Sequence, residues 1–160
     1  MIQPQSRHPN GFLQASALTA AAWGLCLFWV AGAVAQMPPA YQIEQGAIHT
    51  PLAGAGDAAR GRAIVLSRES GNCFLCHAFP DAEASPAGNL GPAMAGVGAR
   101  LNAGQLRLRV VDSSRINAQS IMPAYYRVDG LTQVAAAFRG KSLLNAQQVE
   151  DVVTYLTQLK

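Results

Sequence analysis

The sequence is poor in cysteine, histidine, tryptophan and charge. Its 160 residues include three cysteines, three histidines and two tryptophans, and only 13% of them are charged. Twelve Lys and Arg stand against nine Asp and Glu, and this net charge of +3 is too small to favour a nucleic-acid partner. No alternation of apolar and polar residues persists long enough to predict a β-strand. We therefore expect a helical domain that does not bind nucleic acid.

The first 35 residues are typical of a cleaved signal peptide. Residues 12–34 carry no charge, and Ala33-Val34-Ala35 stands just before Gln36, the small-x-small pattern that signal peptidase accepts. The alternative is a retained membrane anchor, because the apolar run is almost long enough to span a bilayer. The small residues and the closing Ala-x-Ala favour cleavage. We expect export to the periplasm, with residues 36–160 as the mature chain and no stable membrane insertion.

The mature chain would keep two cysteines, Cys73 and Cys76, and His77 directly follows the second in GNCFLCHA. A disulfide here would close a very small, strained loop with little entropic benefit. A thioredoxin-like redox pair needs a βαβ pattern, which is not visible. A zinc site needs two more ligands, and the only other mature histidine is His49, far upstream.

Cys-x-x-Cys-His is the attachment signature of c-type haem. Two thioether bonds must reach the vinyl groups of neighbouring pyrroles, and the next residue must present an imidazole to the iron. A short helical turn lets Cys73, Cys76 and His77 do this together. We therefore expect one covalently bound haem c, with His77 as an axial iron ligand.

Three segments predict helices. Asp57 is a suitable N-cap for a helix to about Glu69, with apolar positions at Ala59, Ala63, Ile64 and Leu66. A short helix is expected over 103–111, where Leu106, Val110 and Val111 are apolar. Asn145 and Gln148 form a capping pair before a last helix over 147–159. Its single apolar stripe consists of Val149, Val152, Val153, Leu156 and Leu159.

Two segments predict irregular structure. Residues 78–99 are rich in Pro, Gly and Ala and have no convincing period, so we expect a loop. Residues 36–56 contain three prolines and several small residues, and are expected to form an extended N-terminal arm.

A helix, CXXCH, a loop with Gly91-Pro92, a Met-Pro pair and a terminal helix together resemble class I c-type cytochromes. The resemblance implies an all-α, class I cytochrome c fold over residues 57–160, packed around the haem. It implies that the first and last helices cross closely, with Gly61 against Tyr155. A glycine inside a helix costs about 1 kcal/mol relative to alanine, and close helix approach would offset that cost.

In that family the proline after the haem motif accepts a hydrogen bond from the proximal imidazole. Pro92 would take this part through its carbonyl, and the bond would fix the tautomer of His77. An ordinary turn proline is the alternative.

Candidates for the second axial ligand are Met37, Met94, Met122 and His49. Met37 and His49 lie in the arm, which we expect to be mobile. Met94 directly follows the Gly-Pro pair, where packing against the haem is its expected role. Met122 lies in SIMPAYY, and Pro123 would stiffen the loop that holds its thioether. For this reason we favour Met122. His/Met ligation would close the iron to substrates, raise its potential and suit electron transfer.

Longer stretches are similar to the SoxX family, the monohaem subunits of SoxAX cytochrome complexes of sulfur-oxidising bacteria. These stretches are SGNCFLCHAFP, GNLGPAMAGVGARLNAGQLRLRVVDSSRIN, IMPAYYRVDGL and NAQQVEDVVTYL. The resemblance implies a periplasmic heterodimer with SoxA that oxidatively conjugates thiosulfate to the cysteine of the carrier SoxYZ, an L-cysteine S-thiosulfotransferase reaction. SoxX would pass the released electrons to another small c-type cytochrome. It implies no catalytic site in this chain, because the catalytic haem of the family belongs to SoxA.

Two other functions remain open at this stage. A free-standing soluble cytochrome c carrier would display a charged ring around its haem edge, whereas a fixed subunit would show apolar area there. Tyr125, Tyr126 and the arm favour the fixed subunit, unless they serve only local packing and tethering. Five arginines between Arg100 and Arg127 form either a docking face or an ordinary solvated surface. A haem-based gas sensor would need an open iron site, which ligation by Met122 would prevent.

Overall fold

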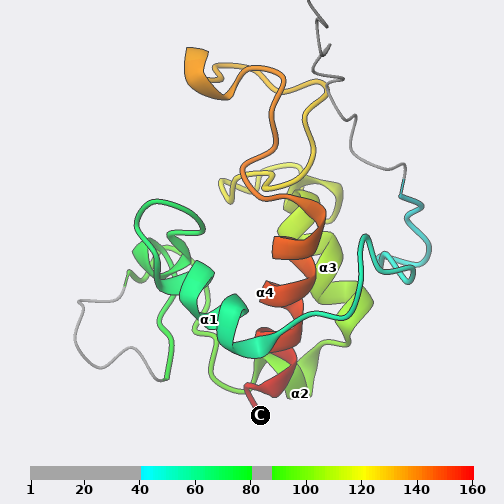
Figure 1. Ribbon diagram of the computed structural model, residues 1–160, viewed down its shortest axis with the longest axis vertical. Helices are drawn as coiled ribbons and strands as arrows, with labels where there is room; N and C mark the ends of the chain where they lie inside the picture. The colour runs from blue at the N-terminus through cyan, green and yellow to red at the C-terminus, as the bar shows by residue number, and fades with distance from the viewer. Residues whose placement is uncertain (1–40, 81–87) are drawn as a thin grey trace, which may run out of the picture. The chain divides into compact units, whose positions relative to one another are not determined.

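The computed structural model describes residues 41–80 and 88–160, which all belong to one unit spanning 36–160. Within these ranges the chain is all-α, as predicted, and its only β-type pairing is an isolated antiparallel bridge between Glu44 and Ala47. The predicted signal peptide and Met37 lie outside the described residues. The helices (Figure 1) are α1 (Ala58–Leu66), α2 (Val97–Arg100), α3 (Ala103–Asp112) and α4 (Ala146–Gln158), with 3₁₀ helices η1 (Cys73–Leu75), η2 (Ser113–Arg115) and η3 (Ala136–Phe138). None of the described helices is long and apolar enough to cross a membrane.

The helix starts follow local capping signals. The side chain of Asp57 accepts a hydrogen bond from the Arg60 amide at 2.8 Å, as its predicted role as N-cap requires. Asn145 and Gln148 form the predicted capping box at the start of α4. A second capping box, Asn102 with Gln105, starts α3 and was not predicted. The prediction of a loop over 78–99 was wrong at its C-terminal end, because α2 begins at Val97.

The close crossing of α1 and α4 confirms the predicted contact between Gly61 and Tyr155. A Cβ atom on Gly61 would lie 2.0 Å from the carbonyl oxygen of Asp151 and 2.9 Å from Cβ of Tyr155. Only a residue without a side chain fits there. The two helices accordingly lie side by side (Figure 1).

The predicted inner face of α1 was partly wrong. Ala59 and Ala63 are exposed, and the buried residues of α1 are Gly61 and Val65. The apolar pattern misplaced the face because the closest contact is made by a glycine, which adds nothing to a hydrophobic stripe. Predictions for the other two helices were confirmed, since Leu106, Val110 and Val111 of α3 and Val149, Val152, Val153 and Leu156 of α4 are buried, with Leu159 partly buried.

An ion pair fastens the start of α1 to α4. Arg60 donates from Nε and Nη2 to the carboxylate of Asp151 at 2.8 Å each, and the Asp57 amide donates to the same carboxylate at 2.8 Å. The hydrogen bonds from Arg60 lower the pKa of Asp151 to about 2. Asp151 therefore stays ionised while buried, and it provides a hydrogen-bond acceptor for the Asp57 amide just before α1.

The described part of the arm, residues 41–56, is packed against the helices. Ile48 is fully buried, and its amide donates to the Gly104 carbonyl at 3.0 Å. The Leu52 amide donates to Glu150 Oε1 at 2.9 Å. The expectation of a mobile arm was therefore wrong for this part, because its backbone groups are paired with α3 and α4.

A buried ion pair lies beneath the arm. Arg107 donates from Nε and Nη2 to Glu150 at 2.7 Å each, and from Nη1 to the Ile48 carbonyl at 2.7 Å. Both side chains are only 5% exposed. One of the five arginines considered for docking is therefore an internal structural group.

We predict that Gly61→Ala destabilises the protein even though alanine is the better helix former. The new methyl group would meet the α4 backbone, which cannot move aside as a flexible side chain can, so the free energy of unfolding should fall by about 1–3 kcal/mol. Denaturant unfolding of the two proteins measures this difference. Gly54→Ala is the matched control, because a Cβ there meets only the Gln147 side chain at 3.5 Å. Equal stability of both variants would contradict the crossing described above.

Candidate haem-binding site

A cavity of about 680 Å³ lies among the helices, with largely apolar walls. It is bordered by Val65 of α1, Leu106 and Val110 of α3, and Val152 and Leu156 of α4. All five site residues predicted from the sequence also line it, namely Cys73, Cys76, His77, Pro92 and Met122. The fold thus brings together residues that are up to 49 positions apart (122 − 73).

The CXXCH segment is held in a tight turn. The amides of Cys76 and His77 both donate to the Cys73 carbonyl, at 3.2 and 3.0 Å. Asn72, just before the turn, has a φ of 49°, in the left-handed region that asparagine tolerates better than most residues. Burial raises the pKa of the Cys73 thiol to about 11.

His77 is oriented by the loop that follows the motif. Its Nδ1 lies 2.7 Å from the Pro92 carbonyl oxygen. This oxygen can only accept, so Nδ1 carries the proton and donates, and Nε2 keeps a free electron pair for a metal. Gly91 makes this approach feasible, since a Cβ there would lie 2.3 Å from Cε1 of His77. Sequence reasoning found the proline but missed the steric need for the glycine beside it.

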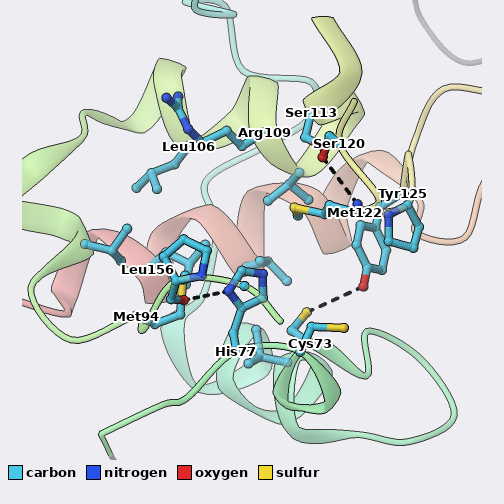
Figure 2. Close-up of a pocket in the computed structure, with 18 of the residues that line it drawn as sticks. Cys73, His77, Met94, Leu106, Arg109, Ser113, Ser120, Met122, Tyr125 and Leu156 are labelled. Atoms are coloured by element: carbon cyan, nitrogen blue, oxygen red, sulfur yellow. Dashed lines mark hydrogen bonds between the residues drawn. The ribbon is translucent and has the colours of Figure 1, made fainter. Parts of the chain in front are cut away.

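Met122 lies across the cavity from His77 (Figure 2). Its amide donates to Ser120 Oγ at 3.3 Å, and Ser120 Oγ lies 2.5 Å from Ser113 Oγ. Met94 also lines the cavity, but it is 9% exposed within the core cluster, and its amide donates to Ala78 beside the CXXCH segment at 2.8 Å. His49 is exposed and does not border the cavity.

Tyr125 was missed as a site residue. Its hydroxyl donates to the Gly71 carbonyl at 2.7 Å and lies 4.0 Å from Sγ of Cys73, as Figure 2 shows for the second contact. Burial raises its pKa. Tyr125 and Tyr126 are only 7% and 2% exposed, so the idea that they form an exposed partner surface was wrong. An aromatic pair after a Met-Pro does not reveal by itself whether it points inward.

The arginines between positions 100 and 127 do not form one face. Arg100 and Arg109 line the cavity, and each donates to a nearby backbone carbonyl, Arg100 to Ala95 at 2.7 Å and Arg109 to Gln105 at 3.0 Å. The remaining pairs tie Arg115 and Arg127 to Asp112, and Arg107 to Glu150. A docking face made of all five is therefore excluded, because Arg107 is buried.

The residues around the cavity suit a haem. Apolar walls match a porphyrin, two thiols in a short turn match two vinyl groups, and the imidazole and thioether are soft and borderline ligands that iron accepts in c-type haem. Among the described residues that line the cavity, Arg100 and Arg109 are the only arginines, and these cations can face propionates. By contrast, no group of three His, Cys, Asp or Glu in the described ranges could hold a bare metal ion. The structure thus offers no described zinc site.

A family model, "Cytochrome c", matches residues 58–160. Among solved structures, the chain is similar to one in the "Crystal structure of SoxXA from P. pantotrophus", with 32% sequence identity and a TM-score of 0.71. The alignment covers 78% of this chain and 98% of that one. The comparison with curated proteins found no match.

Proposed function

Because this chain belongs to the cytochrome c family, whose members carry covalent haem c and transfer electrons, we propose that it is the SoxX-type subunit of a SoxAX complex. The observation that carries the haem assignment is that Cys73, Cys76, His77 and Met122 all border the same cavity. The observation that favours this branch of the family is the 32% identity to a chain of a SoxXA structure, over 98% of that chain.

Each residue of the cavity has a distinct task in this proposal. Cys73 and Cys76 would form the two thioether bonds, and His77 would provide Nε2 as one iron ligand. Met122 would provide its thioether from the opposite wall as the other. Pro92 holds the His77 ring through its carbonyl at 2.7 Å and raises the basicity of the ligating nitrogen. The bound haem supplies an iron centre that takes up and releases one electron.

The chain would surround the iron with groups that favour electron transfer over substrate binding. The cavity walls are mostly apolar, and ligation by both His77 and Met122 would keep water and small ligands away from the metal. A thioether ligand stabilises ferrous iron and so raises the potential. Arg100 and Arg109 would balance the propionate charge within the same low-dielectric environment.

The proposed partners follow from the SoxX assignment. The chain would pair with SoxA in the periplasm after loss of residues 1–35. The complex would join thiosulfate to the SoxYZ cysteine, releasing two electrons, and this subunit would pass them one at a time to another small c-type cytochrome. No catalytic residue is assigned to this chain.

We predict that haem stays with the chain after denaturation, because two thioether bonds do not depend on folding. A denaturing gel stained for haem, and extraction with acidified organic solvent, measure this retention. In Cys76→Ala only one thioether would form, so the reduced pyridine complex should absorb at longer wavelength, since one vinyl group stays conjugated. Complete extraction of haem from the parent protein would contradict the attachment.

We predict that Met122→Ala abolishes the weak red-end charge-transfer band of the ferric protein and lowers the potential. The band requires a thioether on the iron, and axial ligands together span about 0.8 V in haem proteins. Met94→Leu is the matched control, because it roughly conserves volume at a packing position and should keep the band. Loss of the band in Met94→Leu together with its survival in Met122→Ala would reverse the ligand assignment.

We predict that the tagged holoprotein, purified from its native host, brings a second c-type cytochrome with it. The pair should catalyse thiosulfate-dependent modification of a SoxYZ thiol, which neither subunit does as well alone. Intact mass of the carrier protein measures the addition. A monomer that reduces a terminal oxidase directly, and shows no thiosulfate reaction with all partners present, would instead support a free-standing carrier.

A further inference from the structure

We propose that Tyr125 is a positioning residue that keeps the Met122 thioether on the haem iron by tying the methionine segment to the haem-attachment segment. This inference rests on the proposed function, because it concerns the ligation assigned to Met122. The tie is the hydrogen bond from the Tyr125 hydroxyl to the Gly71 carbonyl, at 2.7 Å. Gly71 lies two residues before Cys73, so the bond spans 54 positions and joins two walls of one cavity.

The backbone of Tyr125 is fixed independently of its hydroxyl. Its amide donates to the Val110 carbonyl of α3 at 3.2 Å, and its carbonyl accepts from the Leu144 amide at 2.8 Å. The next amide, of Tyr126, donates to the Val111 carbonyl at 3.3 Å. The ring therefore extends from a firm base on α3 toward the CXXCH segment, and Tyr125 can transmit a restraint between the two.

The acceptor is fixed as well. The Gly71 amide donates to the Ile64 carbonyl at the end of α1, at 3.1 Å. A Cβ on Gly71 would lie 2.5 Å from that same carbonyl oxygen, so the glycine backbone is held close against the helix. Because both ends of the bond are anchored, breaking it leaves the Gly71 carbonyl without its donor in a buried place, which costs free energy.

The segment that carries Met122 has little secondary structure of its own. Residues 120–125, here called the methionine strap, contain no helix, and Ile121 next to the ligand is 78% exposed. The strap is fastened at one end by Ser120, through Ser113 and the Met122 amide, and at the other by Tyr125. A ligand carried on such a short segment without helical structure would leave the metal more often if one fastening loosened, so the hydroxyl of Tyr125 would bear directly on ligation.

The role of Tyr125 can be measured by letting an external ligand compete with Met122 for the ferric iron. An external ligand can bind the ferric iron only in molecules whose thioether has left, so its apparent affinity scales with the fraction of that state. Removing one buried hydrogen bond that favours the state in which Met122 binds the iron should raise this fraction about ten-fold. Global unfolding is a separate process and does not set this fraction.

The test uses Tyr125→Phe in the holoprotein, with imidazole as the external ligand. We expect the ferric haem of the variant to bind imidazole about ten-fold more tightly than the parent, followed as loss of the red-end band. Tyr126→Phe is the matched control, because Tyr126 is equally buried and its hydroxyl has no hydrogen-bond partner among the described residues. Val153→Ala, a core change away from the cavity, should lower global stability without changing imidazole affinity.

The outcomes separate the two proposals. A parent protein without the red-end band would overturn ligation by Met122, and with it this inference. A parent with the band, but a Tyr125→Phe variant that binds imidazole no more tightly than Tyr126→Phe, would overturn the role of Tyr125 alone. If Tyr125→Phe does not accumulate as holoprotein, 3-fluorotyrosine at position 125 decides the matter. It is the stronger hydrogen-bond donor and should weaken imidazole binding, and unchanged affinity there would refute the role.

Discussion

The close approach of backbone to α4 is the constraint on which the rest of the described structure depends. Three glycines, Gly56, Gly61 and Gly98, lie so near this helix that an added Cβ would stand 2.0–2.4 Å from one of its carbonyl oxygens. Each allows a different segment to pack without a side chain between the two backbones. With α4 fixed this way, Val152 and Leu156 face the cavity while Glu150 and Asp151 face the arm and α1. One helix thus organises both the haem side and the opposite side.

The two acidic residues of α4 show how polar groups support that arrangement. The carboxylate of Asp151 accepts hydrogen bonds from the Arg60 side chain and the Asp57 amide. The carboxylate of Glu150 accepts hydrogen bonds from the Arg107 side chain and the Leu52 amide. Buried charges of this kind are tolerated only when they are paired and hydrogen-bonded. Both carboxylates bind backbone amides of segments that enter α1, so they order the chain between the arm and the first helix. The described arm is therefore part of the domain rather than a tether.

The cavity combines local chemistry with distant support. The haem motif is a short turn whose three functional side chains are adjacent in sequence, and the structure holds that turn from three directions. Pro92 accepts a hydrogen bond from the imidazole, and Gly91 leaves room for the ring. The Tyr125 hydroxyl donates to the Gly71 carbonyl, and the Gly71 amide donates to the Ile64 carbonyl at the end of α1. The methionine arrives on the opposite wall from a segment with little structure of its own. In the proposed holoprotein, ligation of the iron by His77 and Met122 would therefore depend on contacts made by residues other than the ligands.

Local signals determined much of this protein from the sequence. The CXXCH spacing, the capping residues Asp57, Asn145 and Gln148, and the apolar stripe of α4 all act within one or two turns, so their pattern predicts them directly. Tertiary structure alone decided the rest. The buried face of α1 centres on a glycine without hydrophobic signal, Arg107 is buried because Glu150 happens to lie opposite it, and Tyr125 is a site residue because Gly71 comes within reach. These outcomes depend on which distant backbone or charge each side chain meets, and that is set by helix packing and not by neighbours along the chain.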